Sequence, residues 1–190
     1  MASQLDYQAL NEVMTWKQTA LGQKIGELES RGTDADIMKQ LEVYAKRFEN
    51  ERPERHRVEL ILKIDELSGS TEYLTEMGVI SMTGFLSIAD SLRSKEEQMG
   101  LEKIKAHVMS RYSEMKNANR NMVFISLMYA YQDLSDTELN QYIEYMETKN
   151  GRRYNAALVS SYKKITNQYI RDMLTKLAPV FKKFKDTKGA

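Results

Sequence analysis

The sequence predicts an all-α protein, a single-domain helical bundle, from three observations. Apolar residues recur at three- and four-residue spacing along most of the 190 residues, whereas strand-type alternation is hard to find. The chain contains only two prolines. A helix–corner–helix motif occurs twice, once near each end. Because domains commonly have about 100–200 residues, we expect one domain over residues 1–186 and a disordered tail over residues 187–190.

The motif is recognised because residues 139–158 (LNQYIEYMETKNGRRYNAAL) repeat residues 10–29 (LNEVMTWKQTALGQKIGELE). A constant offset aligns an aromatic residue, a threonine, a glycine and a basic residue: Trp16 with Tyr145, Thr19 with Thr148, Gly22 with Gly151, and Lys24 with Arg153. A threonine can cap a helix because its side-chain oxygen accepts from an amide two or three residues later. We therefore predict two helices that meet at a corner in each copy.

The glycine of each motif falls near the third position of the second helix, where it costs roughly 1 kcal/mol relative to alanine. Two explanations are open. The helices cross so closely that a side chain would clash with the preceding aromatic residue, Tyr145 in the second copy. Alternatively, Gly151 ends the first helix in the left-handed conformation, after Asn150. Both explanations describe a structural corner, which we favour over a ligand site. Each aromatic residue should pack near the glycine of its own motif.

The second copy opens with the capping box Ser135-Asp136-Thr137-Glu138 inside the segment Leu-Ser-Asp-Thr-Glu-Leu, residues 134–139. Together with Tyr145, Thr148, Gly151 and Arg153, this opening resembles the DUF2059 family of uncharacterised bacterial envelope proteins. The family often has a proline where this chain has Lys149, or Ala20 in the first copy. The resemblance covers the two motif copies only. It implies an exported, all-helical protein and carries no catalytic residues.

The elements before the middle of the chain follow from caps and apolar stripes. Asp6 caps the first helix, which runs to Lys17, and the second runs from the Thr19 corner to about Ser30. After a break at residues 31–33, Thr33 or Asp34 caps the third helix. Pro53 fits the first turn of the fourth. The third and fourth helices carry these apolar stripes: Ile37, Leu41, Tyr44 and Phe48, then Val58, Leu60, Ile61, Ile64 and Leu67.

The middle of the chain should form the centre of the bundle. Residues 71–92 are apolar over much of a helix, with small residues spaced for close packing against a neighbour: Ser81, Gly84, Ser87 and Ser91. A capping box at residues 94–97 is expected to open the next helix, which reaches Tyr112. Residues 122–131, MVFISLMYAY, are the most apolar run and should pair with residues 71–92. Most of the twelve methionines fall on such stripes, among them Met77, Met82, Met122 and Met128, so packing is favoured over an adaptable binding groove.

The last helix should run from about Arg152 to Leu177, with Tyr154, Tyr162 and Tyr169 on its buried stripe and a short amphipathic end starting at Pro179. From Lys149 onward there are eleven Lys and Arg against two Asp. Such asymmetry marks either an anionic partner or two parts of one domain that attract each other, and we favour the second. Nucleic acid is an unlikely partner because buried tyrosines cannot stack on bases.

The residues exclude several kinds of chemistry. Without cysteine there are no disulfides, thiolate metal sites or cysteine nucleophiles. His56 and His107 are the only histidines, and neither belongs to a Glu-x-x-His or His-x-x-x-His motif; Glu54 and Glu59 beside His56 indicate a charged surface. No phosphate-binding loop or Gly-x-Ser-x-Gly turn occurs. We predict no enzyme, no cofactor, and no catalytic, cofactor-binding or metal-ligating residue. An active site assembled from distant helices is left open.

The sequence has no transmembrane segment, since no run reaches the roughly 18–20 apolar residues of a membrane span. It also begins without a signal-peptide pattern. The resemblance implies a periplasmic protein whose export signal has been removed, and without it the chain is expected in the cytoplasm. We expect a non-catalytic binding or interaction module with an apolar groove or exposed patch for an apolar ligand or a protein partner. The alternative is a scaffold whose basic C-terminal helix docks on an anionic surface, membrane or nucleic acid.

Overall fold

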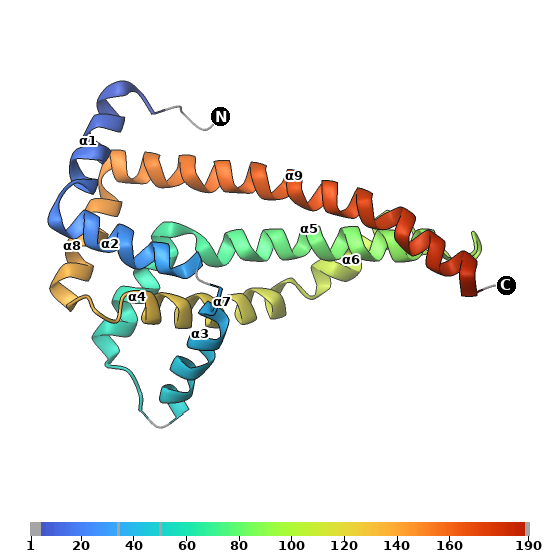
Figure 1. The fold of residues 1–190 in the computed structure, drawn as a ribbon, viewed down its shortest axis with the longest axis horizontal. Helices are drawn as coiled ribbons and strands as arrows, with labels where there is room; N and C mark the ends of the chain where they lie inside the picture. The colour runs from blue at the N-terminus through green and yellow to red at the C-terminus, as the bar shows by residue number, and fades with distance from the viewer. Residues whose placement is uncertain (1–4, 34, 50, 189–190) are drawn as a thin grey trace. The chain divides into compact units, whose positions relative to one another are not determined.

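The computed structural model describes residues 5–33, 35–49 and 51–188, which form helices joined by turns and loops and contain no β-strand (Figure 1). The prediction of an all-α helical bundle is confirmed. The described α-helices are α1 (Tyr7–Lys17), α2 (Ala20–Ser30), α3 (Ile37–Ala45), α4 (Arg55–Ser68), α5 (Ser70–Ser91), α6 (Leu101–Ser110), α7 (Tyr112–Ala130), α8 (Asp136–Glu147) and α9 (Lys149–Lys188). Two 3-10 helices, η1 (Arg31–Thr33) and η2 (Lys46–Glu49), flank α3.

The chain divides into two compact units. The first comprises the described residues up to Thr71 together with Arg120–Ser160, and the second comprises Glu72–Asn119 together with the described residues from Ser161 on. Helices α5, α7 and α9 contribute residues to both units. The expectation of one domain over residues 1–186 stays a prediction.

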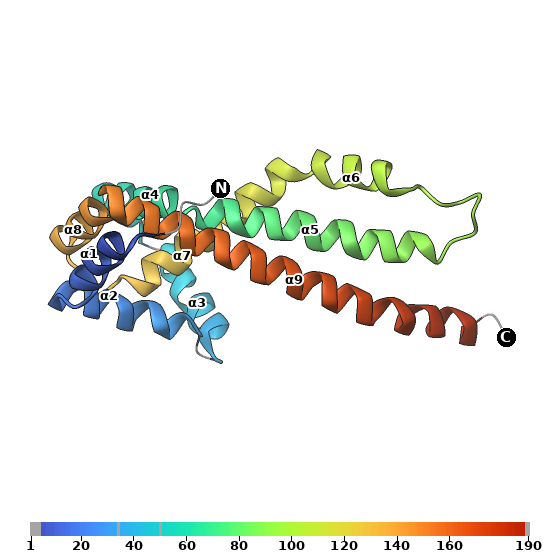
Figure 2. The same ribbon diagram turned by 90° about the horizontal axis from the view of Figure 1, so that it is seen from above.

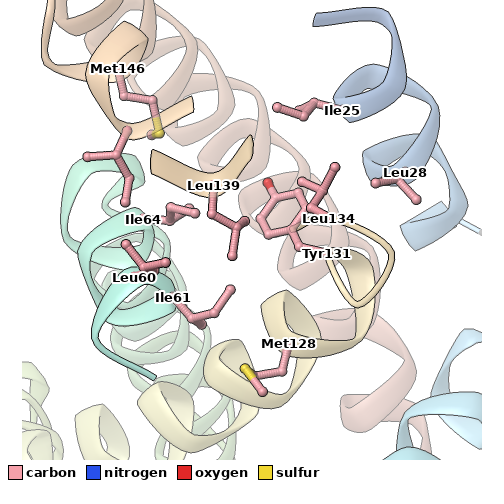
Figure 3. Close-up of a cluster of buried hydrophobic side chains, with 11 residues drawn as sticks. Ile25, Leu28, Leu60, Ile61, Ile64, Met128, Tyr131, Leu134, Leu139 and Met146 are labelled. Carbon is pink, nitrogen blue, oxygen red and sulfur yellow. The ribbon is translucent and has the colours of Figure 1, made fainter. Parts of the chain in front are cut away.

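The first unit is built around a cluster of buried apolar side chains (Figure 3). Leu139 of α8, which is fully buried, lies at its centre, with Ile61 and Ile64 of α4 on one side and Tyr131 on the other. Burying one such aliphatic side chain contributes about 1.5–3 kcal/mol. The other members come from α2, α4, α7, α8 and the turn before α8: Ile25, Leu28, Leu60, Met128, Leu134, Ile143 and Met146.

This cluster corrects the predicted pairing of residues 122–131 with residues 71–92. Met128 and Tyr131 pack with residues of α4 and α8, and the cluster contains no described residue of α5. The apolar side chains at the end of α7 are therefore buried against the apolar stripes of α4 and α8. Met122, which was expected on the core side of its helix, is exposed.

Two predicted helix starts also differ from the structure. Helix α4 begins at Arg55, so Pro53 precedes the helix instead of lying in its first turn. Helix α3 begins after Asp36, so Thr33, which belongs to η1, does not cap it. The alternative cap, Asp34, lies outside the described residues.

In the second unit, a loop joins α5 to α6 where a helix was predicted (Figure 2). The Ser94 hydroxyl donates to the Glu97 carboxylate, but no helix follows, and α6 begins only at Leu101. The physical reason is Asp90, whose carboxylate oxygens accept from the amides of Met99 and Gly100 at 2.8 and 2.9 Å. These bonds fold the loop back onto the end of α5 and give α6 a later start.

Helix α9 is longer than the sequence predicts. It continues through Pro179 as far as Lys188, so residues 179–188 form no separate amphipathic end. A proline removes one backbone hydrogen bond, but its fixed φ is compatible with a helix, and most residues around it are helix formers. Thr187 and Lys188 are therefore helical instead of part of a disordered tail, and residues 189–190 lie outside the described residues.

Candidate functional site

The two motif copies form corners of the same local geometry. Thr19 and Thr148 have extended backbone angles between the helices, with ψ of 158° and 155°. Each hydroxyl accepts from the amide of the motif glycine, from Gly22 at 3.1 Å and from Gly151 at 2.9 Å. Each also donates to the carbonyl of the motif aromatic residue at 2.7 Å. The predicted threonine cap and corner are confirmed in both copies.

The motif requires glycine because the helices approach each other through their backbones. A Cβ at Gly22 would lie 2.4 Å from the Trp16 carbonyl oxygen, and one at Gly151 would lie 2.1 Å from that of Tyr145. The prediction of a close crossing is confirmed, but the clash is with the carbonyl of the aromatic residue and not with its ring. The left-handed alternative for Gly151 is wrong, since only Gly69 and Gly100 have positive φ among the described residues.

The two copies contact each other inside the first unit, where α1, α2, α8 and the start of α9 lie together (Figures 1 and 2). The rings of Trp16 and Tyr145 stack with centroids 3.6 Å apart and planes 7° apart. The two rings cover each other face to face, so each removes apolar surface of the other from water. The aligned aromatic residues of the motif therefore join the two copies to each other.

The aligned basic residues join the copies reciprocally. Lys24 Nζ of the first copy lies 2.7 Å from Glu138 Oε1, in the capping box of α8. Arg153 Nη2 of the second copy lies 3.0 Å from Asp6 Oδ2, the N-cap of α1. Each basic side chain thus reaches the N-terminal end of the first helix of the other copy, α8 for Lys24 and α1 for Arg153. This reciprocity assigns the repeat a structural role.

A small polar cavity lies beside this junction. Tyr131 and Tyr142 both donate to Glu29 Oε1, at 2.7 and 3.0 Å, and burial is the main cause that raises the pKa of both tyrosines. Burial also raises the pKa of Tyr145 to about 12. The cavity measures about 70 Å³, well below the roughly 300–1,000 Å³ of small-molecule pockets. The junction therefore offers no room for a metabolite.

A larger groove lies within the second unit and measures about 490 Å³. Helices α5, α6 and α9 line it with mostly apolar or small side chains: Val79, Ile80, Thr83, Gly84, Ser87, Leu101, Lys105, Met109 and Leu174. Two of these apolar side chains, Leu101 and Met109, are exposed to solvent. The groove has the size and the apolar lining typical of a ligand-binding pocket.

Small residues on α5 create the hollow. A Cβ on Gly84 would lie 2.1 Å from Leu174 Cδ1, so the glycine lets this leucine of α9 lie directly against the α5 backbone. Gly78 similarly faces the end of Met115, 2.9 Å away. The predicted close packing along the row Ser81, Gly84, Ser87 and Ser91 is confirmed at Gly84, and Gly78 is a further close approach that was not predicted. Thr83 and Ser87, one turn apart, leave space in the wall where larger side chains would fill the groove.

Lys105 provides the one cationic side chain of the groove lining. It stands on α6 between Leu101 and Met109, and its Nζ lies 2.9 Å from Glu102 Oε1. Both partners are largely exposed, and such pairs contribute only about 0–1 kcal/mol. An anionic group at the edge of the groove could replace Glu102 at little cost.

A second hollow, in the first unit beside α3, measures about 250 Å³. Ile37, Met38 and Leu41 form its apolar side, and Arg31 and Gln132 line its polar side. It is smaller than the groove, and its lining is more polar. We therefore regard the groove of the second unit as the candidate site.

Titratable groups are not gathered in either hollow. His56 and His107 are both exposed. Among the residues that the structure describes, no group of three or more His, Asp or Glu side chains is placed to hold a metal ion. No helix in the described ranges has the length and apolarity needed to cross a membrane. Asp90 has a lowered pKa, mainly because the amides of Met99 and Gly100 donate to it, which is a structural role.

Comparison of the chain with protein-family models, curated proteins and solved structures finds no match. The resemblance to the DUF2059 family stays a prediction that rests on the motif residues.

Sequence reasoning singled out the small residues of α5 but missed two residues that shape the groove, Lys105 and Leu174. Leu174 was not part of the stripe predicted to be buried on the last helix, which contained Tyr154, Tyr162 and Tyr169. A signal was nevertheless present, because the row of small residues on α5 indicates that a neighbouring helix approaches it closely. Met77 and Met128 are buried as predicted, whereas Met109 lines the groove.

Proposed function

We propose that the chain is a non-catalytic binding module that holds an apolar ligand, such as a lipid acyl chain, in the groove of the second unit. The observation that carries the proposal is the groove lining, in which six of nine residues carry no charge or hydroxyl group. Burying apolar surface contributes about 25 cal/mol per Å², so an apolar chain gains free energy by entering such a groove without needing a specific hydrogen bond.

The lining also limits what kind of ligand fits. Thr83 and Ser87 offer hydroxyl groups, and Lys105 offers one positive charge at the edge. A polar metabolite would lose its hydration without gaining matching partners, which disfavours its binding. A ligand with one apolar chain and an anionic end fits best, since the chain can lie along α5 while the anion lies near Lys105.

The bacterial envelope, and the periplasm in particular, is the location that we propose. The support is the resemblance of the motif residues to an exported family, at Tyr145, Thr148, Gly151 and Arg153. Fractionation of the native host tests this location directly. Recovery of the protein in the periplasmic fraction is the expected result, and recovery in the cytoplasm would contradict it.

Native mass spectrometry of the protein purified from its host tests the groove. The expected spectrum shows a reproducible added mass that disappears in the variant Ser87→Phe, because the ring would fill the groove. Ala89→Phe is the matched control, since Ala89 is exposed on α5 and lies outside the groove lining. Circular dichroism should show both variants folded.

Three outcomes would contradict the proposal. One is a clean mass for the native protein that stays unchanged when oleate is added. Another is an added mass that Ser87→Phe and Ala89→Phe retain equally, which would place the ligand elsewhere. The third is a mass that identifies a bound protein partner, which would assign the groove to protein–protein recognition.

A further inference from the structure

Helix α9 exposes an apolar stripe in the second unit. Tyr162, Ile165 and Tyr169 expose 57%, 66% and 68% of their surface. Their spacing of three and four residues places them on one side of the helix. The sequence predicted that these tyrosines are buried, and the structure corrects this. Large exposed apolar residues are common singly, but three in a row on one helix face mark an interaction surface.

An adjacent side of α9, about 40–100° around the helix from Tyr162, holds the helix in its unit. Ile170 is buried there, Lys163 Nζ lies 2.6 Å from Glu76 Oε2, and the Thr166 and Tyr73 hydroxyls lie 2.6 Å apart. Of the stripe, Tyr162 also contacts α5, since its ring centroid lies 6.5 Å from that of Tyr73. The buried Ile170 and the polar contacts of Lys163 and Thr166 would remain if the exposed side chains of the stripe were changed.

Positive charge outweighs negative charge around the stripe, although the exposed Asp172 lies on it, two turns after Ile165. Residues 161–188 contain eight Lys and Arg against two Asp. Lys164, Arg171 and Lys176 are exposed, and Lys176 continues the stripe itself, two turns after Tyr169. Lys164 and Arg171 lie about 100–120° around the helix from Ile165 and about 160–180° from Tyr162, so Ile165 and Tyr169 lie between Tyr162 and the two cations. The exposed half of α9 thus combines an apolar row with a basic row.

This combination selects among possible partners. A second copy of the same helix would bring two basic surfaces together, and like charges oppose such pairing. Nucleic acid would satisfy the cations, but Ile165 would gain nothing from phosphates or sugars. An anionic lipid surface satisfies both rows, because apolar side chains enter the headgroup boundary while Lys and Arg meet anionic headgroups. Tyrosine is enriched at that boundary in membrane proteins.

We propose that the exposed face of α9, formed by Tyr162, Ile165, Tyr169 and the flanking Lys164, Arg171 and Lys176, binds the surface of anionic lipid membranes. The chain attaches peripherally, with the stripe at the headgroup level and without crossing the bilayer. This face is separate from the groove, so membrane attachment does not depend on a bound groove ligand.

Vesicle co-sedimentation of the full chain tests the proposal. We expect binding to vesicles of equal parts phosphatidylglycerol and phosphatidylcholine, little binding to phosphatidylcholine alone, and weaker binding at higher salt. The double variant Lys164→Glu/Arg171→Glu should bind more than about tenfold more weakly. Lys39→Glu/Arg52→Glu is the control, because it changes the net charge equally on exposed residues of the first unit and should retain binding.

A second variant separates the apolar row from the charge. Replacing Tyr162, Ile165 and Tyr169 together with serine keeps every charge. It removes side chains that are more than half exposed and one ring contact, between Tyr162 and Tyr73, so circular dichroism should show that the fold persists. We expect more than about tenfold weaker binding to the anionic vesicles. The groove variant Ser87→Phe should bind these vesicles as the parent does, which distinguishes this proposal from ligand binding in the groove.

Four results would overturn the inference. Binding to phosphatidylglycerol vesicles could be absent, or it could be unchanged in the triple serine variant. Concentration-dependent dimers that the serine changes abolish would assign the stripe to a second copy. Tighter binding to a single-stranded oligonucleotide than to the vesicles, lost in the Lys164→Glu/Arg171→Glu variant, would assign the face to nucleic acid.

Discussion

The core of the first unit and the faces of the second unit use apolar residues in opposite ways. Around α4 and α8, aliphatic side chains such as Leu139 and Ile61 are completely buried. In the second unit, Leu101, Met109 and Ile165 remain exposed although they are equally apolar. Since burial supplies most of the stabilising free energy, the first region should determine stability. The second unit also buries Ile104 and Val108, but its exposed apolar residues are those that we propose to contact a ligand and a membrane.

The largest expected effect tests this contrast directly. Leu139→Ala removes a fully buried side chain from the centre of the cluster and should lower the free energy of unfolding by about 2–5 kcal/mol. Ile165→Ala removes a similar side chain from an exposed position and should change it by about 0.5 kcal/mol or less. Urea denaturation followed by circular dichroism measures both. Equal losses would show that Ile165 is part of a core.

The next effect tests the two backbone crossings. Gly151→Ala places a Cβ 2.1 Å from the Tyr145 carbonyl oxygen, so the corner must open, and we expect a loss of about 1–3 kcal/mol. Gly26→Ala is the matched control on α2, because nothing lies within 4 Å of its Cβ position. That change should stabilise the protein by about 0.5–1 kcal/mol through helix propensity. A stabilising Gly151→Ala would contradict the close crossing.

The motif could be read from the sequence because its interactions are local. Thr148, Gly151 and the Tyr145 carbonyl lie within seven consecutive residues, so capping and helix geometry determine how they meet. The reciprocal pairs Lys24–Glu138 and Arg153–Asp6 could not be read this way. They join residues more than one hundred positions apart, and their distances depend on how the helices pack.

The candidate site was less predictable for the same reason. A stripe on α9 shows which residues are apolar, but it does not show which side of the helix finds a partner. Ile170 is buried and Leu174 lines the groove, whereas Ile165 and Tyr169, which fit the predicted stripe better, face solvent. Asp90 gave no sequence signal, since its partners Met99 and Gly100 are brought to it only by the folded loop.

The smallest effect concerns the ion pairs between the motif copies and appears as a pH dependence. Hydrogen bonds lower the pKa of Glu138 from 4.5 to about 2. The largest contribution comes from Lys24, followed by the amide and the hydroxyl of Ser135. Because the folded-state pKa is lowered, the stabilisation by Glu138 is complete above about pH 4.5 and is lost as the pH falls toward 2. Lys24→Met should raise the pKa of Glu138 and move acid unfolding to higher pH.

The other copy supplies a matched comparison, because the causes of the lowered pKa rank differently there. The pKa of Asp6 is lowered first by the amide of Ala9 and only second by Arg153. Arg153→Met should therefore raise the pKa of Asp6 less than Lys24→Met raises that of Glu138. Carboxyl ¹³C shifts followed by NMR from pH 6 downward measure both values. A larger change at Asp6 would mean that the ion pair with Arg153, and not the hydrogen bond of the helix cap, is the main cause of the lowered pKa of Asp6.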